Sequence, residues 1–331
     1  MSTLRSGFDA LLVDLDGTVY AGPTAIPGAV DALSKSEQRV LYVTNNASRA
    51  PGDVAEHLRE LGLPAEDADV VTSAQASAGL LAEQLPAGAA VLVVGTEALA
   101  AEIRERGLVP VRELAAGPAA VVQGHSPETA WPILAEAALA IRGGAVWVAA
   151  NLDPTLPSDR GLLPGNGSMV AVLRSATDTE PQVAGKPAPP IMRDAVARAR
   201  AQHPLVIGDR LDTDIAGGRA AELPTLLVMT GVSTALDVLR ADATERPDYL
   251  AGDLSALDRP ATDAAVGPVD GWAARLEGDS LVVACDDPDA DPWDGLRAAC
   301  PVAWQGGAVV TVTAEGAGAE AALRAWGVTT A

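Results

Sequence analysis

Short runs of apolar residues alternate along the chain with longer segments in which apolar residues recur every three or four positions. The first run, residues 8–13, leads directly into acidic residues, as buried strands of a parallel sheet often do. Residues 51–61 instead place Val54, Leu58 and Leu61 on one helical face. The alternation predicts an α/β fold with largely parallel sheets.

Further strands are expected at 39–43, 91–94, 119–123, 145–149, 205–207 and 225–229. Helices are expected at 97–106, 128–141, 169–175, 191–201 and 213–221. The tail after about residue 259 differs, because it holds four of the six tryptophans, both cysteines and a dense acidic stretch at 286–294. A segment rich in Ala, Asp and Pro precedes it, as a linker would. We expect the tail to form a small α+β appendage.

The chain is strongly acidic, with a formal net charge of −21. A field of that sign repels nucleic acid and anionic membrane surfaces, so neither is an expected partner. A phosphorylated metabolite would need a local cation, either a metal ion or a basic side chain. Only two lysines occur, Lys35 and Lys186, which makes a lysine within a motif more informative than usual.

No charged-then-apolar signal pattern opens the sequence, and no apolar run reaches the length of about 18 residues needed for a membrane span. We therefore expect a cytoplasmic protein. Cys285 and Cys300 do not make a disulfide framework. The oligomeric state stays open, with a homodimer as one option.

The strongest chemical signal is Asp14-Leu15-Asp16-Gly17-Thr18, directly after the first predicted strand. Carboxylates two residues apart leave a strand end on the same side, and sites of parallel α/β sheets form at that edge. The pair suits phosphoryl transfer, because one carboxylate can be the nucleophile while the other acts as acid and then as base. The alternative is a strand-to-turn junction rich in aspartate.

Three further polar elements follow in order. Thr44-Asn45-Asn46 ends a strand, where a hydroxyl and backbone N–H groups can hold phosphoryl oxygens. Lys186, between a glycine and a proline, can neutralise the nucleophile and the transferring group. Asp209 and Asp214 supply the carboxylates that Mg²⁺ prefers. Taken singly, these elements have plainer alternatives: a polar turn or helix N-cap, a solvated loop lysine and an acidic helix start.

Together and in this order, the four elements resemble the motifs of the haloacid dehalogenase superfamily of phosphatases. The resemblance covers roughly residues 7–258. It implies that Asp14 is the nucleophile and Asp16 the general acid and base. It also implies that Mg²⁺ is bound by Asp14, the backbone carbonyl of Asp16 and Asp209, with Asp214 supporting the metal shell.

The same resemblance implies that Thr44 and Lys186 hold the phosphoryl oxygens, with Asn45 and Asn46 in the same phosphate-binding turn. A predicted turn at 158–161 carries Arg160, which could reach the leaving group of the substrate. The alternative for Arg160 is a solvated loop charge.

The spacing of the motifs predicts the domain organisation. Asp14 and Thr44 are 30 residues apart, too few for an inserted domain, whereas the 142 residues from Thr44 to Lys186 exceed any ordinary loop. This resembles the NagD-type subfamily, whose cap lies between the second and third motifs. We expect a doubly wound Rossmann-like core at 1–75 and 184–258, an inserted α/β cap at 76–183 and the appendage at 259–331.

Family members hydrolyse glycerol phosphate, phosphoglycolate, pyridoxal phosphate or aryl phosphates. The tail resembles the acetyltransferase-like appendage of actinobacterial glycerol-3-phosphate phosphatases in this subfamily, so we expect glycerol 3-phosphate as the substrate. Composition agrees, because the predicted cap holds only two aromatic residues, Trp131 and Trp147, on which a flat ring could stack.

Two alternatives stay open. One is a phosphotransferase that uses the same aspartyl-phosphate, and the other is a regulatory protein whose tail binds a metabolite. The segment 315–318 lacks the basic or amide residue that leads an acetyl-CoA site, since Thr313 stands in its place. We therefore expect the tail to be a structural remnant.

Overall fold

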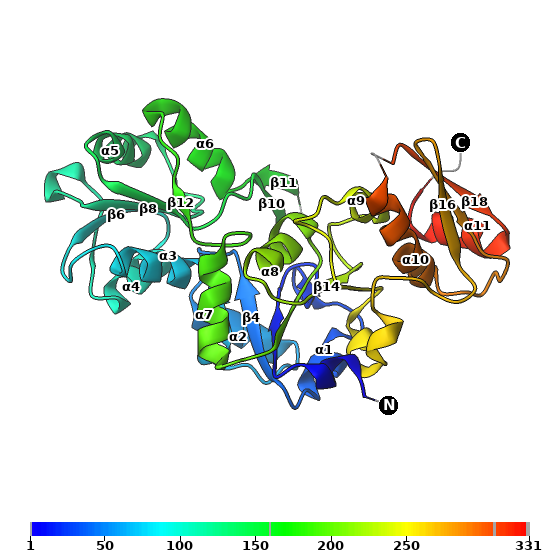
Figure 1. Cartoon of the computed structure of the whole chain (residues 1–331). Coiled ribbons are helices and arrows are strands. Elements are labelled where there is room, and N and C mark those ends of the chain that lie inside the picture. Colours follow the sequence, from blue (N-terminus) through cyan, green and yellow to red (C-terminus); the bar gives the residue numbers. More distant parts are fainter. Residues whose placement is uncertain (1, 159, 307–308, 329–331) are drawn as a thin grey trace. The chain divides into compact units, whose positions relative to one another are not determined.

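The computed structural model describes residues 2–158, 160–306 and 309–328 (Figure 1). Its internal contacts divide the chain into two compact units, one formed by Met1–Val40 with Ala199–Ala331 and the other by Leu41–Arg198. Within the described ranges, no helix combines the length and the apolar character that crossing a bilayer requires.

The first unit is built on four parallel strands in the order β15-β14-β13-β1. These are β1 (Ala10–Val13), β13 (Pro204–Gly208), β14 (Thr225–Val228) and β15 (Tyr249–Ala251). Every residue of β1, β13 and β14 is buried, as is typical of parallel strands covered on both faces. Val13 lies opposite Ile207 in the register, so Asp14 and Asp209 emerge at the same edge of the sheet.

Short helices and a hairpin complete this part of the unit: α1 (Ala29–Ser34), α8 (Ala216–Ala220), α9 (Ala235–Arg240), β2 (Tyr20–Ala21) and β3 (Thr24–Ala25). The helix expected at 213–221 is divided into a π-helical turn, Leu211–Ile215, and α8. The reason is local, because the backbone N–H groups of Asp214 and Ile215 both donate to the Arg210 carbonyl.

The tail forms the small α+β appendage that was expected. Its elements are β16 (Ala273–Glu277), β17 (Ser280–Ala284), α10 (Pro292–Gln305), β18 (Thr311–Glu315) and α11 (Ala317–Ala325). Strand β17 pairs antiparallel with β16 and parallel with β18, so this sheet is mixed. The appendage belongs to the first unit, in which it joins the same hydrophobic core as α9 and β14.

The second unit contains a five-stranded parallel sheet in the order β12-β9-β8-β6-β7. Its strands are β6 (Ala90–Val94), β7 (Val109–Val111), β8 (Ala120–Gln123), β9 (Val146–Ala149) and β12 (Gln182–Val183). Helices α5 (Trp131–Arg142) and α6 (Asn166–Thr177) cover one face, and α3 (Ser73–Ala82) and α4 (Glu97–Glu105) cover the other (Figure 1).

The same unit holds β4 (Arg39–Thr44), which pairs in parallel with β5 (Val70–Thr72). Helices α2 (Pro51–Glu60) and α7 (Pro189–Ala199) and the hairpin of β10 (Thr155–Ser158) and β11 (Gly161–Pro164) complete it. Helix α5 begins at Trp131 rather than at 128, because a proline occupies its first turn and favours a start there.

The observed architecture confirms the expected fold class, an α/β protein with parallel sheets and a small mixed C-terminal sheet. The strands expected from apolar runs are present within a residue or two of their predicted ends. The domain boundaries at 75, 183 and 258 stay predictions.

Candidate active site

Three carboxylates meet at the strand ends of the first unit. One oxygen each from Asp14, Asp209 and Asp214 lies within 4.8 Å of the others, and we call these residues the carboxylate group. Asp14 follows β1 directly, and Asp209 follows β13. Asp209 and Asp214 are 0% and 1% exposed, whereas Asp14 is half-buried. The structure therefore brings together the two acids expected as metal ligands and the acid expected behind them.

Backbone N–H groups and a hydroxyl hold these carboxylates in place. Val232 N donates to Asp209 Oδ2 at 2.7 Å, and Thr18 Oγ1 lies 3.4 Å from Asp209 Oδ1. Arg210 N donates to Asp214 Oδ2 at 3.1 Å. Such donors stabilise the ionised form of a carboxylate.

Two glycines make room for the Asp209 carboxylate. A Cβ at Gly17 or at Gly231 would collide with its oxygens. Gly17 also has φ +89°, a backbone conformation that other residues rarely adopt. The glycine of the first motif is therefore required both by its backbone angle and by the neighbouring carboxylate.

The carboxylate group fits a hard divalent cation. Three buried or half-buried carboxylates repel one another unless a cation or a proton offsets their charge, and oxygen atoms are the ligands that such cations prefer. The side chain of Asp16 is exposed and does not belong to this group. The expected role of its backbone carbonyl as a metal ligand stays a prediction.

In the second unit, Lys186 and the turn after β4 form a cluster that we call the lysine group: Thr44, Asn45, Asn46 and Lys186. Thr44 and Lys186 are 4% and 3% exposed. Lys186 Nζ donates to the Val43 carbonyl at 3.0 Å, which places the ammonium group at the end of β4 beside Thr44. The lysine is thus not the solvated loop residue that was the alternative.

Asn45 fixes the main chain of Lys186. Its Oδ1 accepts from Lys186 N at 2.8 Å, and its Nδ2 donates to Lys186 O at 3.0 Å and to Asp153 Oδ2 at 3.3 Å. Asn46 has a different partner, because its Oδ1 accepts from the backbone N–H and the hydroxyl of Ser48. These contacts make Asn45 a support for Lys186, and direct phosphate binding by either asparagine stays a prediction.

Two asparagines from the segments 151–154 and 163–167, within the predicted cap, join this cluster. Asn151 Nδ2 donates to the Asn45 carbonyl at 2.7 Å, and Asn166 Nδ2 donates to the Asn151 carbonyl at 2.8 Å. Both side chains are buried. The two segments therefore act through main-chain carbonyls to hold the turn that carries Asn45.

Arg160 lies in the turn between β10 and β11 and is exposed. Its backbone N–H donates to Ser158 Oγ at 3.2 Å. Asp159, named in the same predicted turn, lies outside the described residues. A contact of Arg160 with the leaving group stays a prediction.

The sequence analysis missed the loop at 229–234, between β14 and α9. Besides the bond from Val232, Ser233 N donates to the Asp209 carbonyl at 3.2 Å, and Thr230 Oγ1 donates to the Gly17 carbonyl at 2.6 Å. Thr230-Gly231 directly after an apolar strand was the available signal, since polar residues at strand ends often belong to sites.

Comparison with known proteins agrees with this geometry. The profile of the haloacid dehalogenase-like hydrolases matches residues 11–109, and a second profile of hydrolases of this kind matches residues 183–257. The D-glycerol 3-phosphate phosphatase of Mycobacterium tuberculosis is 51% identical over 339 residues, which span 98% of this chain and 96% of that protein. The chain belongs to the haloacid dehalogenase-like hydrolases.

Solved structures of this family match closely. The glycerol phosphate phosphatase of M. tuberculosis, crystallised with magnesium, superimposes with a TM-score of 0.95 at 51% identity, covering 99% of this chain and 100% of that one. The p-nitrophenyl phosphatase of Archaeoglobus fulgidus has a TM-score of 0.69 at 29% identity, covering 76% of this chain and 97% of that one.

A third profile, that of GCN5-related N-acetyltransferase-like domains, matches residues 269–328 and confirms the expected resemblance of the appendage. The start of its last helix, α11, is bonded to the chain itself. Gly318 N and Ala319 N donate to the Cys285 carbonyl at 2.9 and 3.1 Å. A Cβ at Gly316 or Gly318 would collide with the segment 285–287. Two of the N–H groups that could hold an anion at this helix start are thus already used.

Proposed function

We propose that this chain is a Mg²⁺-dependent phosphatase that hydrolyses a small phosphate monoester, with glycerol 3-phosphate as the substrate. The observation that carries the proposal is the carboxylate group, in which Asp14, Asp209 and Asp214 meet at the ends of parallel strands. The support for the substrate is the 51% identity, over nearly the full length of both chains, to a D-glycerol 3-phosphate phosphatase.

In the proposed reaction, an Asp14 oxygen attacks phosphorus, and the bond from phosphorus to the leaving alkoxide breaks. Protonated Asp16 gives its proton to that alkoxide, so glycerol departs as the alcohol. Asp16 then takes a proton from a water molecule that attacks the aspartyl-phosphate, releasing phosphate and restoring Asp14.

Asp14, Asp209 and the backbone carbonyl of Asp16 are the groups that would hold Mg²⁺, with Asp214 supporting them from behind. When bound, the ion would offset negative charge on the carboxylates and the phosphoryl group. Thr44 and Lys186 are proposed to hold the phosphoryl oxygens, because Lys186 carries a buried positive charge and Thr44 a buried hydroxyl at one strand end.

One feature of the second unit favours an aliphatic substrate. Trp147 is 3% exposed and packs in the core beneath α5 and α6, so it offers no face for stacking a flat ring. Arg160 is proposed to contact the leaving group, and a homodimer is proposed as the oligomeric state.

The test is phosphate release from glycerol 3-phosphate, phosphoglycolate, pyridoxal 5′-phosphate, 4-nitrophenyl phosphate and a nucleoside monophosphate, with Mg²⁺ and with EDTA. Glycerol 3-phosphate should have the highest kcat/KM, and EDTA should abolish turnover. A tenfold preference for pyridoxal phosphate or the nucleotide, about 1.4 kcal/mol in the transition state, would overturn the substrate. Full turnover in EDTA would refute the proposed requirement for Mg²⁺.

A further inference from the structure

The appendage shares a hydrophobic core with the loops that carry the carboxylate group. Leu211 and Ile215, which follow Asp209 in the chain, are buried in the same cluster as Val238 of α9 and Leu296 of α10. A displacement of α10 would therefore be transmitted to α9 and to the segment after β13, because close-packed cores transmit strain.

Side chains of the appendage also bond the end of α9. Trp304 Nε1 donates to the Val238 carbonyl at 2.9 Å. Arg240, the last residue of α9, donates in the other direction, from Nε to the Val309 carbonyl at 2.8 Å and from Nη2 to the Val310 carbonyl at 3.1 Å. The Val238 carbonyl also accepts from Ala241 N at 3.2 Å, so the tryptophan is its second donor and ties α10 to the last turn of α9.

Arg246 also contacts Trp304, and it links this residue to the end of α9. Its guanidinium lies 5.2 Å from the centre of the Trp304 ring, a distance suited to a cation–π interaction. Its Nη2 donates to the Trp304 carbonyl at 3.1 Å, and its Nε donates to the Ala241 carbonyl at 3.1 Å. Trp304 is thus held between two successive segments of the core, α9 and the loop after it.

Helix α9 depends on such contacts because it has only six residues. Isolated helices shorter than about 12 residues are marginal in water, so packing must fix its position. The loop at 229–234, whose Val232 N–H holds the Asp209 carboxylate, runs directly into α9 through the N-cap Thr234. The position of α9 therefore contributes to the position of that N–H, together with the bonds made by Thr230 and Ser233.

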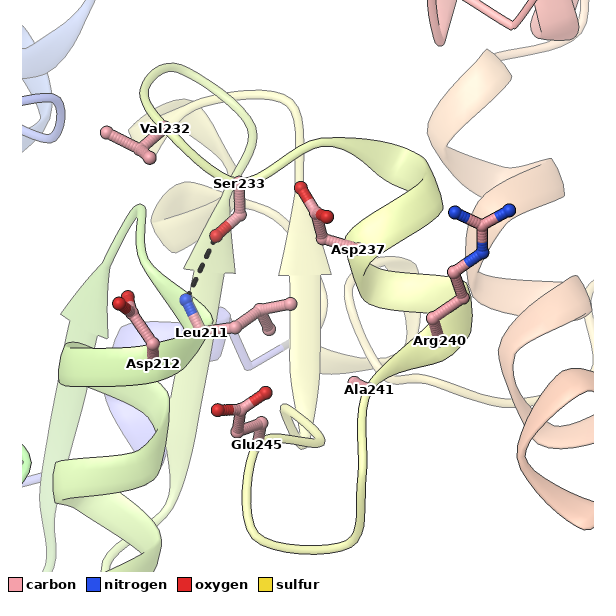
Figure 2. Close-up of a pocket in the computed structure, with 8 residues that line it drawn as sticks. All are labelled: Leu211, Asp212, Val232, Ser233, Asp237, Arg240, Ala241 and Glu245. Carbon is pink, nitrogen blue, oxygen red and sulfur yellow. Dashed lines mark hydrogen bonds between the residues drawn. The ribbon is translucent and has the colours of Figure 1, made fainter. Parts of the chain in front are cut away.

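The loop has little support of its own on one side. A cavity of about 380 Å³ lies beside it. The residues that line it are drawn in Figure 2: Leu211, Asp212, Val232, Ser233, Asp237, Arg240, Ala241 and Glu245. Two of these residues are bonded to each other, since Ser233 Oγ accepts from Leu211 N at 3.0 Å. The Arg240 side chain points away from both of them (Figure 2). Val232 is 61% exposed. The loop is therefore held by the hydrogen bonds of Thr230 and Ser233 and by its connection to α9, while the Val232 side chain contributes little packing.

We propose that Trp304 is a positioning residue for the carboxylate group. By fixing α9, it holds the Val232 N–H against the Asp209 carboxylate and thereby raises the affinity for a divalent cation. The acetyltransferase-like appendage is, in this respect, a brace for the metal-binding loop of the phosphatase. The inference rests on one part of the proposed function, the binding of Mg²⁺ by the carboxylate group.

The test is calorimetric titration of Mg²⁺ into the full chain and its Trp304→Phe variant. Phenylalanine keeps a ring beneath Arg246 and removes the N–H that bonds Val238. Partners that bond a metal ligand directly are worth about 10- to 100-fold in metal affinity. Trp304 acts one step further out, so we expect the Kd for Mg²⁺ to rise about threefold to tenfold. The kcat at saturating Mg²⁺ should stay close to the wild-type value.

The matched control is Trp326→Phe. Trp326 Nε1 donates to the Pro292 carbonyl at 3.0 Å, a bond of the same kind that lies wholly within the appendage. This variant should lose thermal stability without a change in the Mg²⁺ Kd. An unchanged Kd in Trp304→Phe, or an equal rise in Trp326→Phe, would overturn the inference.

A second variant, Arg246→Met, removes the guanidinium above the Trp304 ring and should raise the Kd in the same direction by a smaller factor. It serves if Trp304→Phe does not fold, and a wild-type Kd in this variant would then overturn the inference. If the wild-type chain binds Mg²⁺ but releases no phosphate, the proposed phosphatase activity is refuted, while the positioning role of Trp304 is not affected. Wild-type chain that binds no Mg²⁺ would refute both.

Discussion

The carboxylate group and the lysine group both stand at the ends of parallel strands, yet they are held in different ways. In the first, hydrogen-bond donors touch the charged oxygens themselves, as Val232 N does at Asp209 and Arg210 N at Asp214. In the second, Asn45 bonds the main chain of Lys186, while the ammonium group reaches the Val43 carbonyl through its own long side chain.

This difference shows in which group the charge of a side chain and its position can be altered separately. A substitution in the carboxylate group changes the charge and the hydrogen bonds that hold it together. In the lysine group, a substitution of Asn45 can disturb the position of Lys186 without changing its charge. A substitution of Lys186 can remove the charge without removing the bonds from the Asn45 side chain to its main chain. Three substitutions test this contrast, and a fourth, at Asp9, measures a carboxylate outside both groups.

The largest effect is expected for Asp14→Asn. The amide is a poor nucleophile and a weak cation ligand, so phosphate release should fall by at least about 10⁴-fold, the scale seen when a nucleophile is removed. Circular dichroism should show an intact fold. The matched control is Asp212→Asn, since Asp212 is exposed and pairs with Arg210 rather than joining the carboxylate group. Turnover retained in Asp14→Asn would refute the proposed mechanism.

Lys186→Met should lower kcat by about 10²- to 10³-fold, because it removes one positive charge from a buried site while keeping the length of the side chain. The chain offers the ideal comparison in its other lysine. Lys35 is exposed and lies 3.5 Å from Asp31, so Lys35→Met should leave kcat unchanged. Equal effects of the two substitutions would mean that Lys186 has no part in the chemistry.

Asn45→Ala should act through position alone. It removes the bonds to Lys186 N and Lys186 O, and leaving such part-buried groups without a partner costs about 1–3 kcal/mol of stability. Misplacement of the lysine should also lower kcat/KM by roughly 10- to 100-fold. Gln182→Ala, which removes an exposed amide bonded to Gln84, should change neither quantity. A stable but inactive Asn45→Ala protein would instead favour direct contact with substrate.

The smallest effect is expected at Asp9, which precedes β1 as Asp14 follows it. The Gln202 backbone N–H, together with that of His203, holds the pKa of Asp9 below its ordinary value of 3.8. A lowered folded pKa stabilises the fold above pH 3.8, and this contribution is lost as pH falls through the folded pKa.

Asp9→Asn should therefore lower the melting temperature by a few degrees at neutral pH, and the difference from wild type should shrink below pH 3.8. Melting curves between pH 7 and pH 2.5 measure it, with phosphate release at neutral pH unchanged. A difference that stays constant over this range would show that the charge of Asp9 does not contribute.

The sequence was sufficient to predict the strands that end at Asp14, Thr44 and Asp209, because a buried parallel strand followed by polar residues is a local signal. Through the order of the motifs and the family that this order resembles, it was also sufficient to group Asp14, Asp209 and Asp214, whose carboxylates the structure brings together. Their roles as metal ligands stay predictions. The division of the helix after Asp209 was missed, since it arises from one carbonyl that accepts two N–H groups.

The hydrogen bonds that hold these residues in place could not be predicted from the sequence, for a physical reason. Val232 bonds Asp209 through a backbone N–H, and every residue except proline has one, so its identity carries no signal. Asn45 looked like a ligand for phosphate, because a sequence motif does not show that the amide is used by the main chain of Lys186. Trp304 and its carbonyl partner on α9 are 66 residues apart, which no periodic pattern links.

The register of β1 has a consequence for how the protein is made. Ala10 pairs with Pro204 and Val13 with Ile207, so the first strand of the sheet meets this neighbour only after most of the chain has left the ribosome. Pairings between residues so distant in sequence are slow to form. During synthesis the second unit can fold while the first strand waits, and β1 exposes an apolar edge prone to aggregation in the meantime. Asp14 therefore cannot meet Asp209 and Asp214 until synthesis has passed residue 214.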